Sequence, residues 1–300
     1  MGNIGIALAG ALGVQDKKRR AIVLTGVAGV LWGTSFPAIK IGLEYVDAYM
    51  FVFLRFLLAS IVMLFLLSIK RNYGFEFAKN KAVWFLGIVN GAAYLLQYVG
   101  MNSTSASKSS LLVNLSAIWV AILSWLLLKE RLGKKRALGI SFGILGVFLI
   151  TTKLDFQALG QGGAIGDLLV LSSGVTWAFF TLYNKQLVSN TRKTIQPITW
   201  IIFITLLPLA PFLLFSTSTP FQLPVEAWLA IAYTAIFCWV IPYYLWSEGL
   251  KYISAVNSTI ILLAEVIVAL AISSVLLHDP LTLIQEIGAV LIIAAIVFVS

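Results

Sequence analysis

The stretch YLLQYVGMNSTSASKSSLL, residues 94–112, lies over YYLWSEGLKYISAVNSTII, residues 243–261, when the chain is shifted by 149 residues. Any single match is weak evidence, because apolar sequences use few residue types. The register nevertheless continues along both halves, and near their starts a shift of 145 residues places GVLWGTSFPAIK over GVTWAFFTLYNK. The matched pairs include Tyr94 with Tyr243, Gly100 with Gly249, Ser109 with Ser258, Glu130 with Asp279, and Trp32 with Trp177. The sequence therefore predicts an internal duplication.

The composition is typical of a membrane protein. Of 300 residues, 60% are hydrophobic and 11% are charged, and the mean hydropathy is +0.97. A soluble domain has about 25% charged residues, so the apolar surplus should face lipid. Continuous apolar stretches recur at about the 20 residues that a membrane helix needs, whereas a barrel would need alternating stretches of about 10. We predict an all-α integral membrane fold with ten transmembrane helices, at about 21–40, 48–69, 82–101, 108–128, 135–152, 164–184, 195–215, 226–247, 254–277 and 281–300.

The net charge of +9 has a one-sided distribution along these spans. One end of the bundle would carry Lys17, Lys18, Arg19, Arg20, Lys70, Arg71, Lys79, Lys81, Lys129, Arg131, Lys134, Lys135, Arg136, Lys185, Arg192, Lys193 and Lys251. The other end would carry Lys40, Arg55, Lys108 and Lys153. The positive-inside rule then places both termini in the cytoplasm, with the chain in the inner or plasma membrane. Attraction to anionic lipid is a by-product, and nucleic acid is not needed to explain the charge.

Each half contains five spans, which is an odd number, so the halves should enter the membrane in opposite directions. Inverted repeats are typical of secondary transporters, whose substrate site lies near the bilayer midplane between the halves. We expect a cytoplasmic leader over 1–20, a first five-helix unit over 21–152 and a second over 164–300. A water-filled pocket should lie between the two units.

Four stretches have an informative order and spacing. They are LWGTSFPAIKIGL at 31–43, LRFLLAS at 54–60, LLLKERLGKKRALGISFGILGV at 126–147 and ILLAEVIVALAISSVLLHDPLTLIQEIGAVLII at 261–293. Together they resemble the drug/metabolite transporters built from two EamA-type repeats. The resemblance implies the ten-helix fold and export of amino acids, other metabolites or drugs, and the tyrosines of the third span resemble those lining the cavity of aromatic amino acid exporters. Ala117 and Val266 stand where the family usually has proline, and Asp279 stands where it has glutamate.

Two ionisable residues lie inside apolar spans. Glu265 is the only charge between about 255 and 277. An acidic residue there costs about 2.5–3.5 kcal/mol to insert, so it should face the protein interior or water. It is predicted to couple protons or bind a substrate ammonium, and the alternative is a protonated side chain that hydrogen-bonds a neighbouring helix. Arg55 would bind a substrate carboxylate, which suits a planar guanidinium, or would bond carbonyl groups near a helix end.

Polar and aromatic side chains share one face of the third span. Asn90, Tyr94, Gln97 and Tyr98 follow the spacing i, i+4, i+7, i+8, which places them on one side of a helix. Such a face should line a cavity, because hydrocarbon would leave its polar groups without partners. The candidate substrate-binding residues are Trp32, Thr34, Ser35, Arg55, Tyr94, Gln97, Tyr98, Asn114, Trp177, Tyr243, Tyr244 and Trp246, with Glu265 as the coupling residue. For Asn114, hydrogen bonding between helices is an equal alternative.

Motifs for enzyme chemistry are missing from the sequence. One histidine, His278, and one cysteine, Cys238, rule out HExxH and cysteine-cluster metal sites. We predict no enzyme activity and no cofactor, and the expected partners are a small-molecule substrate, membrane lipid and protons, for a monomer or weak homodimer. The predicted function is a secondary or facilitative exporter of small metabolites, first of all amino acids, by alternating access. The alternatives are a transporter of a larger metabolite or drug, such as a nucleotide-derived cofactor or a sugar phosphate, a membrane-embedded enzyme, or a channel.

Overall fold

The computed structural model describes residues 2–69, 71–101, 103–104, 106–130, 132–157, 163–277 and 281–300, without the side chains of 2–14, 36, 40, 106–108, 110, 273, 276 and 277. Several residues discussed above therefore lie outside the described part of the chain: Lys70, Arg131, His278 and Asp279, and the side chains of Lys40 and Lys108.

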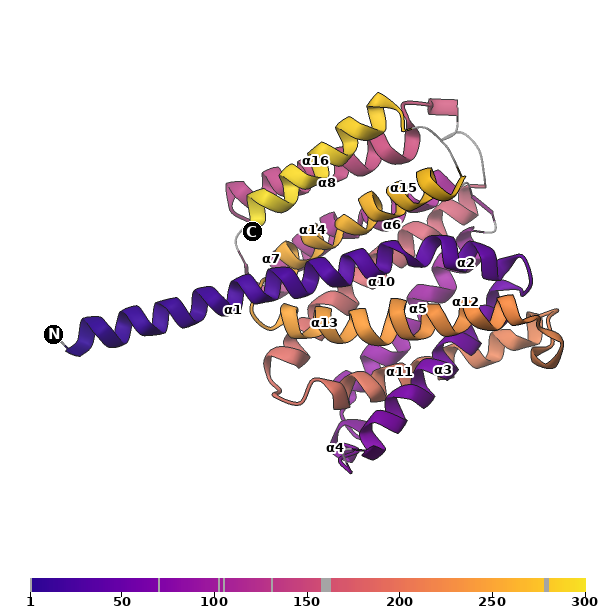
Figure 1. Cartoon of the computed structure of the whole chain (residues 1–300), viewed down its shortest axis with the longest axis horizontal. Helices are drawn as coiled ribbons and strands as arrows, with labels where there is room; N and C mark the ends of the chain where they lie inside the picture. Colours follow the sequence, from indigo (N-terminus) through magenta and orange to yellow (C-terminus); the bar gives the residue numbers. More distant parts are fainter. Residues whose placement is uncertain are drawn as a thin grey trace.

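All ten apolar stretches form helices, which pair backbone N–H and C=O groups internally where no water is present. Among the described residues, nine helical segments are long and apolar enough to cross a membrane, and a tenth, Leu283–Val299, has 17 residues. The all-α membrane fold class is thus confirmed. The spans in order are α1 (Gly2–Gly33) with α2 (Ser35–Leu43), α3 (Ala48–Ile69), α5 (Lys81–Met101), α6 (Ala106–Asn114) with α7 (Ser116–Leu128), α8 (Lys134–Thr152), α10 (Ala164–Ser189), α11 (Ile195–Leu209) with η1 (Ala210–Phe215), α12 (Val225–Ala235) with η3 (Ile236–Val240) and α13 (Ile241–Leu250), α14 (Ala255–Leu262) with α15 (Ala264–Leu277), and α16 (Leu283–Val299) (Figure 1). The short helices α4 (Phe75–Ala78) and η2 (Pro220–Gln222) lie in connections.

The contacts between helices repeat from one half of the chain to the other. In the first half, the first span (α1) packs on the eighth span (α13) and on the ninth (α14 and α15). In the second half, the equivalent sixth span (α10) packs on the third span (α5) and on the fourth (α6 and α7). Helix α3 packs on α12, as α11 packs on α5. Equivalent helices of the two halves also meet each other, as α3 with α11, α7 with α14 and α8 with α16, and the α8–α16 pair forms one edge of the bundle in Figure 1. This pattern is what an internal duplication predicts.

Four spans are interrupted within the bundle, besides the seventh, which ends in the 3-10 helix η1. The fourth span breaks at Leu115 and the ninth at Leu263, positions that differ by 148 residues and are therefore nearly equivalent under the repeat shift of 149. The first span turns at Thr34. The eighth span contains the π-helical segment η3, and π-helical turns inside α-helices are frequent at functional sites.

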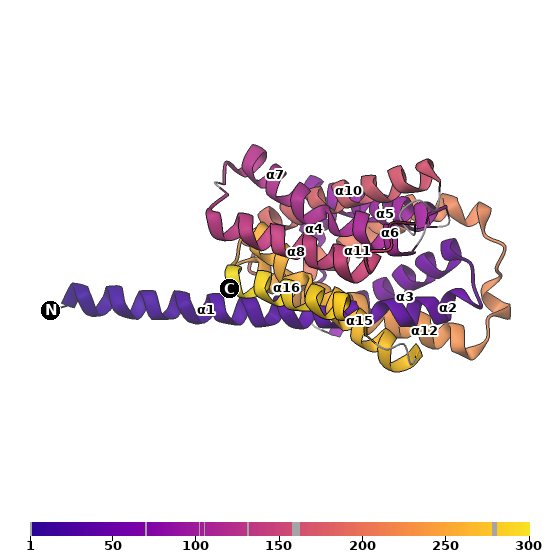
Figure 2. The same cartoon turned by 90° about the horizontal axis from the view of Figure 1, so that it is seen from above.

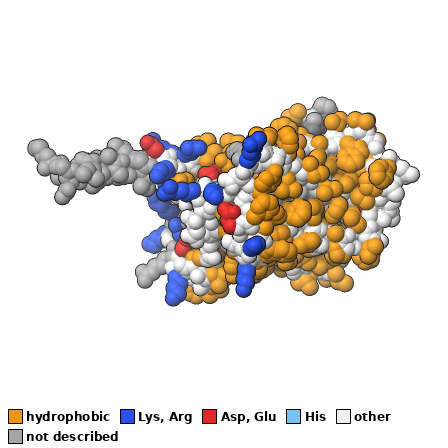
Figure 3. Space-filling view, turned by 90° about the horizontal axis from the view of Figure 1, so that it is seen from below, with side chains coloured by type: hydrophobic (Ala, Val, Ile, Leu, Met, Phe, Trp, Pro, Cys, Tyr) orange, Lys and Arg blue, Asp and Glu red, His pale blue; other side chains and the backbone are white. Residues whose placement is uncertain are grey.

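Basic side chains gather at one end of the bundle. Figure 3 shows Lys and Arg side chains concentrated beside α1, which projects from the bundle in Figures 1 and 2, and hydrophobic side chains over much of the rest of that face. Large hydrophobic residues are openly exposed along the spans, including Phe65 at 63%, Trp125 at 60% and Val290 at 63%. Lipid is the environment in which such surfaces are stable, because exposed apolar area of this extent would be costly in water.

Candidate functional site

An aromatic cluster surrounds Tyr94 in the interior, where α3, α5, α10 and η3 meet. The centroid of the Tyr94 ring lies 5.0 Å from that of Phe56, 5.1 Å from Trp177 and 5.5 Å from Trp239, each in edge-to-face geometry. Tyr98 follows one turn later at 6.1 Å. Such pairs contribute about 0.5–1.5 kcal/mol each beyond burial. The rings therefore hold these four elements at a defined spacing.

The cluster continues into helices of the other half and into the first span. Trp239 lies 5.2 Å from Tyr243, and Tyr243 lies 5.7 Å from Trp246. The Trp246 ring packs edge to face against Trp32 of α1, with their centroids 5.7 Å apart, and it lies nearly parallel to the ring of Phe180 of α10, with their centroids 6.2 Å apart. Spans from both halves thus contribute rings to one continuous cluster.

Arg55 is buried beside these rings, with 2% of its surface exposed. Its guanidinium carbon lies 5.6 Å from the Tyr94 ring centroid and 5.9 Å from that of Trp239, within the range of cation–π attraction. Its Nη2 donates a hydrogen bond to the Cys238 carbonyl at 3.2 Å. Pro242 follows Cys238 by four residues and has no N–H for that carbonyl. Arg55 therefore gives this carbonyl a side-chain donor inside the π-helical segment η3, just before the proline.

Glu265 lies in the first turn of α15, directly after the break at Leu263. Helix α1 approaches this break closely because Gly33 has no side chain, and a Cβ there would lie 2.7 Å from the Glu265 carbonyl oxygen. Glu265 and Arg55 both lie near enough to the Tyr94 hydroxyl to act on it electrostatically. The carboxylate of Glu265 has neither a hydrogen-bond nor an ion-pair partner among the described residues. One basic and one acidic side chain therefore lie within electrostatic range of the same tyrosine hydroxyl.

Polar groups on the Tyr243 side of the cluster are hydrogen-bonded. The Tyr243 hydroxyl donates to Asn184 Oδ1 at 3.3 Å, and Asn184 Nδ2 donates to Ser247 Oγ at 3.3 Å. Trp246 Nε1 donates to Ser258 Oγ at 2.8 Å. These bonds fix the ring orientations on this side.

The Tyr94 side of the cluster leaves some polar atoms without partners. Trp177 Nε1 donates to Gln97 Oε1 at 3.4 Å, and Asn90 Nδ2 donates to Thr205 Oγ1 at 2.9 Å. Trp239 Nε1 and Asn90 Oδ1 are buried with no hydrogen bond among the described residues. Buried polar atoms in native proteins are normally paired, so these two are positions where a ligand or water can bind.

The aromatic cluster is closed in this conformation. A cavity of about 10 Å³ lies beside Tyr94 and Tyr98, between α3, α5 and α11, which is room for about one water molecule. Aromatic rings fill much of the place where the sequence predicted a water-filled pocket, and the space described beside Tyr94 is small. A substrate can reach the cluster only if the helices separate.

Most of the residues predicted from the sequence meet at this cluster. They are Trp32, Arg55, Tyr94, Gln97, Tyr98, Trp177, Tyr243 and Trp246. Thr34 lies at the turn of the first span, where it accepts a hydrogen bond from the Tyr233 hydroxyl at 2.8 Å. Ser35 and Asn114 are buried outside the ring contacts.

Tyr244 does not belong to the cluster, contrary to the sequence prediction. Its side chain is 41% exposed, whereas Tyr243 is fully buried. Neighbouring residues on a helix point about 100° apart, so the two adjacent tyrosines cannot both face the interior.

Trp239 is the main cluster residue that the sequence analysis missed. The 149-residue shift pairs Trp239 with Asn90 and Ser247 with Tyr98. The polar face of the third span therefore has a complete counterpart in the eighth span, and extending the repeat to every position of that face identifies Trp239. Phe56 and Asn184 had no comparable signal, because phenylalanine and asparagine occur in many membrane helices without contacting a site.

Contacts between the two halves close the end of the bundle that is poor in basic residues. Asp47 Oδ2 accepts hydrogen bonds from Ser216 Oγ at 2.6 Å and from the N–H groups of Thr217 and Ser218 at 3.1 and 3.0 Å. Its Oδ1 accepts from two N–H groups in the first turn of α3 at 3.0 and 3.1 Å. Burial opposes ionisation of Asp47, but these hydrogen bonds outweigh it and hold its pKa below the ordinary value of 3.8.

The basic end is closed by a second set of contacts between the halves. They join the segment around α4 to the start of α11, through Gln196 Nε2 to Asn72 Oδ1 at 2.5 Å, Trp200 Nε1 to the Tyr73 carbonyl at 3.0 Å, and the exposed ion pair of Lys193 with Glu76 at 3.3 Å. Bonds between the two halves therefore join segments at both ends of the bundle.

Comparisons with known proteins agree with this architecture. The sequence model of the EamA-like transporter family matches residues 19–152 and, a second time, residues 164–300. "Uncharacterized transporter YyaM" of Bacillus subtilis (strain 168) is 29% identical over 286 residues, covering 93% of this chain and 92% of that protein. A "Probable amino-acid metabolite efflux pump" of Salmonella typhimurium is 27% identical over 285 residues, covering 89% of this chain and 90% of that protein. A crystal structure with 18% identity has the same fold, with a TM-score of 0.79 over 93% of this chain and 95% of that chain. With both halves matching one family model, the chain belongs to the EamA-like transporter family and is a multi-pass membrane transporter.

Proposed function

We propose that the protein exports small zwitterionic metabolites, with amino acids as the first candidates. The observation that carries the proposal is that a basic residue, Arg55, lies against the Tyr94 ring, while an acidic residue, Glu265, lies at the nearby break of the ninth span that packs on α1. Arg55 and Glu265 both act electrostatically on the Tyr94 hydroxyl, and neither has an ion-pair partner among the described residues. An amino acid carries one carboxylate and one ammonium, which complement this pair.

Each group of the site has a separate role in binding. The planar guanidinium of Arg55 suits two parallel hydrogen bonds to a carboxylate, and Glu265 binds the ammonium. The rings of Tyr94, Trp177 and Trp239 contact the substrate side chain, and Trp239 Nε1 offers a donor that has no partner among the described residues. The printed name of the Salmonella relative supports the amino acid class.

Transport in this proposal works by alternating access between two inverted units, 21–152 and 164–300. The repeated helix contacts support this division. Release of the Asp47 hydrogen bonds opens one end, and release of the bonds around Gln196 opens the other. In each step the aromatic rings separate and make room for the substrate. Glu265 carries a proton in exchange for the substrate, which couples export to the proton gradient.

The proposed orientation places both termini and the basic end in the cytoplasm, following the positive-inside rule. The basic side chains in Figure 3 support this assignment. Asp47 then lies at the outer end, in the periplasm or outside the cell. Cysteine-scanning with a membrane-impermeant thiol reagent tests the assignment, and labelling of a terminal cysteine from outside would overturn it.

Counterflow in proteoliposomes tests the substrate class. Liposomes loaded with an unlabelled amino acid should take up the same labelled amino acid with saturation, for neutral or aromatic amino acids. Arg55→Lys should lower the apparent affinity about 10- to 150-fold, which corresponds to losing a charged hydrogen bond of about 1.5–3 kcal/mol. Glu265→Gln should abolish the dependence on a proton gradient, while Glu286→Gln, which alters an exposed carboxylate on α16, should not.

Several outcomes would contradict the proposal. Counterflow of a nucleotide-derived cofactor or sugar phosphate without amino acid counterflow would indicate a larger anionic substrate. Flux that does not saturate would indicate a channel. Chemical conversion of the substrate without transport would indicate an enzyme.

A further inference from the structure

Helix α8, the fifth span, has two faces of different character. Gly139, Gly143 and Gly146 follow the spacing i, i+4, i+7 and lie on the face that packs against α16. A Cβ on Gly146 would lie 2.6 Å from the Gly288 carbonyl oxygen, so only glycine allows this approach. Small residues bring membrane helices together in this way. The opposite face of α8 is turned toward α6 and α7 of the fourth span.

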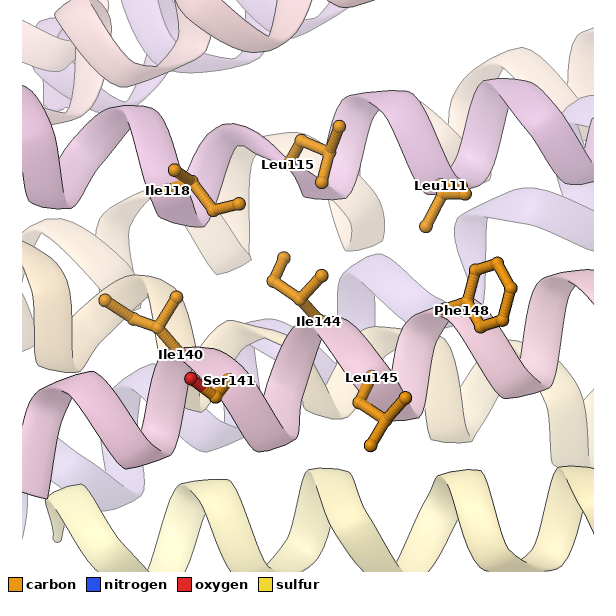
Figure 4. A pocket seen from close by; sticks show the side chains of 8 residues that line it. All are labelled: Leu111, Leu115, Ile118, Ile140, Ser141, Ile144, Leu145 and Phe148. Carbon is orange, nitrogen blue, oxygen red and sulfur yellow. The ribbon is translucent and has the colours of Figure 1, made fainter.

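An apolar groove of about 470 Å³ lies along that opposite face, between α8 and the fourth span. Figure 4 shows Ile144 and Phe148 pointing across the gap toward Leu115 and Leu111. Ser141 is the one polar residue of the lining, and its hydroxyl donates to the Ala137 carbonyl of its own helix at 3.0 Å. The groove therefore presents hydrocarbon and no unsatisfied donor to its occupant.

The length of the groove is close to the depth of one membrane leaflet. The lining residues of α8 run from Ile140 to Phe148, which is about 12 Å along the helix at about 1.5 Å per residue, and Ile140 lies about 9 Å beyond Lys134, the first residue of α8. One leaflet contributes about 15 Å of hydrocarbon, half of the bilayer core of about 30 Å. With the start of α8 at the headgroup level, the groove crosses the inner part of this leaflet, and its far end, about 21 Å from Lys134 along the helix, reaches the middle of the bilayer or a little beyond it.

Positive charge lies at the membrane-surface end of the groove. Lys129, Lys134 and Lys135 are exposed and have no hydrogen-bond or ion-pair partner among the described residues. Arg136, in contrast, binds Asn257 Oδ1 at 3.1 Å, and its Nη1 lies 3.5 Å from Glu130. Lysine side chains at this level attract anionic headgroups.

We propose that the groove binds an acyl chain of an anionic phospholipid whose phosphate is held by Lys134 and Lys135. The shape and apolar lining fit the chain, and the lysines fit the headgroup. A second copy of the protein docked on the same face would bring the lysines of both copies together, which like charges oppose. A polar substrate would find no charged group within the groove, because Arg55 and Glu265 are not among its lining residues.

Lipid binding to the purified full-length protein tests the contribution of the lysines. Native mass spectrometry would compare retention of dioleoyl phosphatidylglycerol with that of dioleoyl phosphatidylcholine. Each lysine should contribute about fivefold to affinity, so Lys134→Gln with Lys135→Gln should weaken phosphatidylglycerol binding on the order of 25-fold. Lys79→Gln with Lys81→Gln removes two exposed charges from the same end, away from the groove, and should leave binding unchanged. Equal losses in both double variants, or no loss in either, would overturn the proposal.

A second pair of variants tests the groove itself. Ser141→Phe fills the groove, whereas Leu138→Phe adds a ring at a 46% exposed position of α8 that does not line it. The Ser141→Phe protein should no longer retain phosphatidylglycerol, and added phosphatidylglycerol should no longer raise its thermal unfolding temperature. The Leu138→Phe protein should behave like the unchanged protein in both measurements. Unfolding without lipid should be the same for both variants, which separates loss of lipid from loss of folding. Undiminished lipid binding in Ser141→Phe, or a protein dimer that this variant alone dissociates, would overturn the proposal.

Discussion

Replacing Arg55 with methionine and Pro242 with alanine, singly and together, tests why a guanidinium is buried in an apolar span. Arg55 donates to the Cys238 carbonyl at 3.2 Å, and Pro242 cannot bond that carbonyl because it has no N–H. Alanine at 242 restores an N–H four residues after Cys238. Because α13 begins at Ile241, we expect this N–H to take α-helical register and bond the Cys238 carbonyl, which would then no longer depend on Arg55.

The size of the coupling follows from this one shared carbonyl. A hydrogen bond to a charged group contributes about 1.5–3 kcal/mol. Arg55→Met should lower the free energy of unfolding in both backgrounds. The loss should be larger by about 1.5–3 kcal/mol when residue 242 is proline than when it is alanine. This difference is about 10- to 150-fold in the unfolding equilibrium. Loss of the cation–π contacts with Tyr94 and Trp239 is common to both backgrounds, so it cancels in the comparison.

Reversible unfolding in mixed micelles, followed by tryptophan fluorescence, measures the four stabilities of this double-mutant cycle. Additive effects within about 0.5 kcal/mol would refute the shared-carbonyl explanation. Transport in proteoliposomes then separates the two roles of Arg55. If Arg55 binds the substrate carboxylate, the double variant should regain stability without regaining transport, and recovered transport would make Arg55 a structural residue.

Three further predictions follow from the packing of the site and its ends. Gly33→Ala should destabilise the protein by about 1–3 kcal/mol, because its Cβ would overlap the Glu265 carbonyl, while Gly26→Ala, which has open space around it, should be neutral or stabilising in the same unfolding assay. Trp239→Phe should lower substrate affinity in counterflow without lowering stability by more than about 1.5 kcal/mol, since its Nε1 has no partner to lose among the described residues; unchanged affinity would remove it from the site. Asp47→Asn should open the outer end and increase labelling of a cysteine introduced at Ser218 by an impermeant thiol reagent, because the amide cannot accept all the bonds that the carboxylate accepts. Since the pKa of Asp47 is lowered below 3.8, this closure should persist above that value and weaken only as the pH falls through the lowered pKa; weakening near pH 6 would contradict the assignment.

The positions of the helices, the duplication and the family were predictable from sequence alone. In a membrane, an apolar stretch of about 20 residues must satisfy its backbone within itself, so hydropathy determines both element type and approximate length. The match between Tyr94 and Tyr243 and their neighbours is likewise a property of the sequence. Helix periodicity also placed Tyr94 and Tyr98 on one face, and the structure places both in the aromatic cluster.

The tertiary structure decided which of these side chains meet. Tyr243 faces the cluster and Tyr244 faces outward, because the rotation of α13 is set by its packing on α1 and not by its composition. The partnership of Arg55 with Cys238 joins residues 183 positions apart, and Cys238 lies in the π-helical segment η3. Whether the halves enclose a cavity is also a tertiary property, and here the rings close it to about 10 Å³ beside Tyr94. The hydropathy of the sequence determines where each helix lies along the chain and about how long it is. Ring packing and the few polar bonds between helices determine how the helices are rotated toward one another.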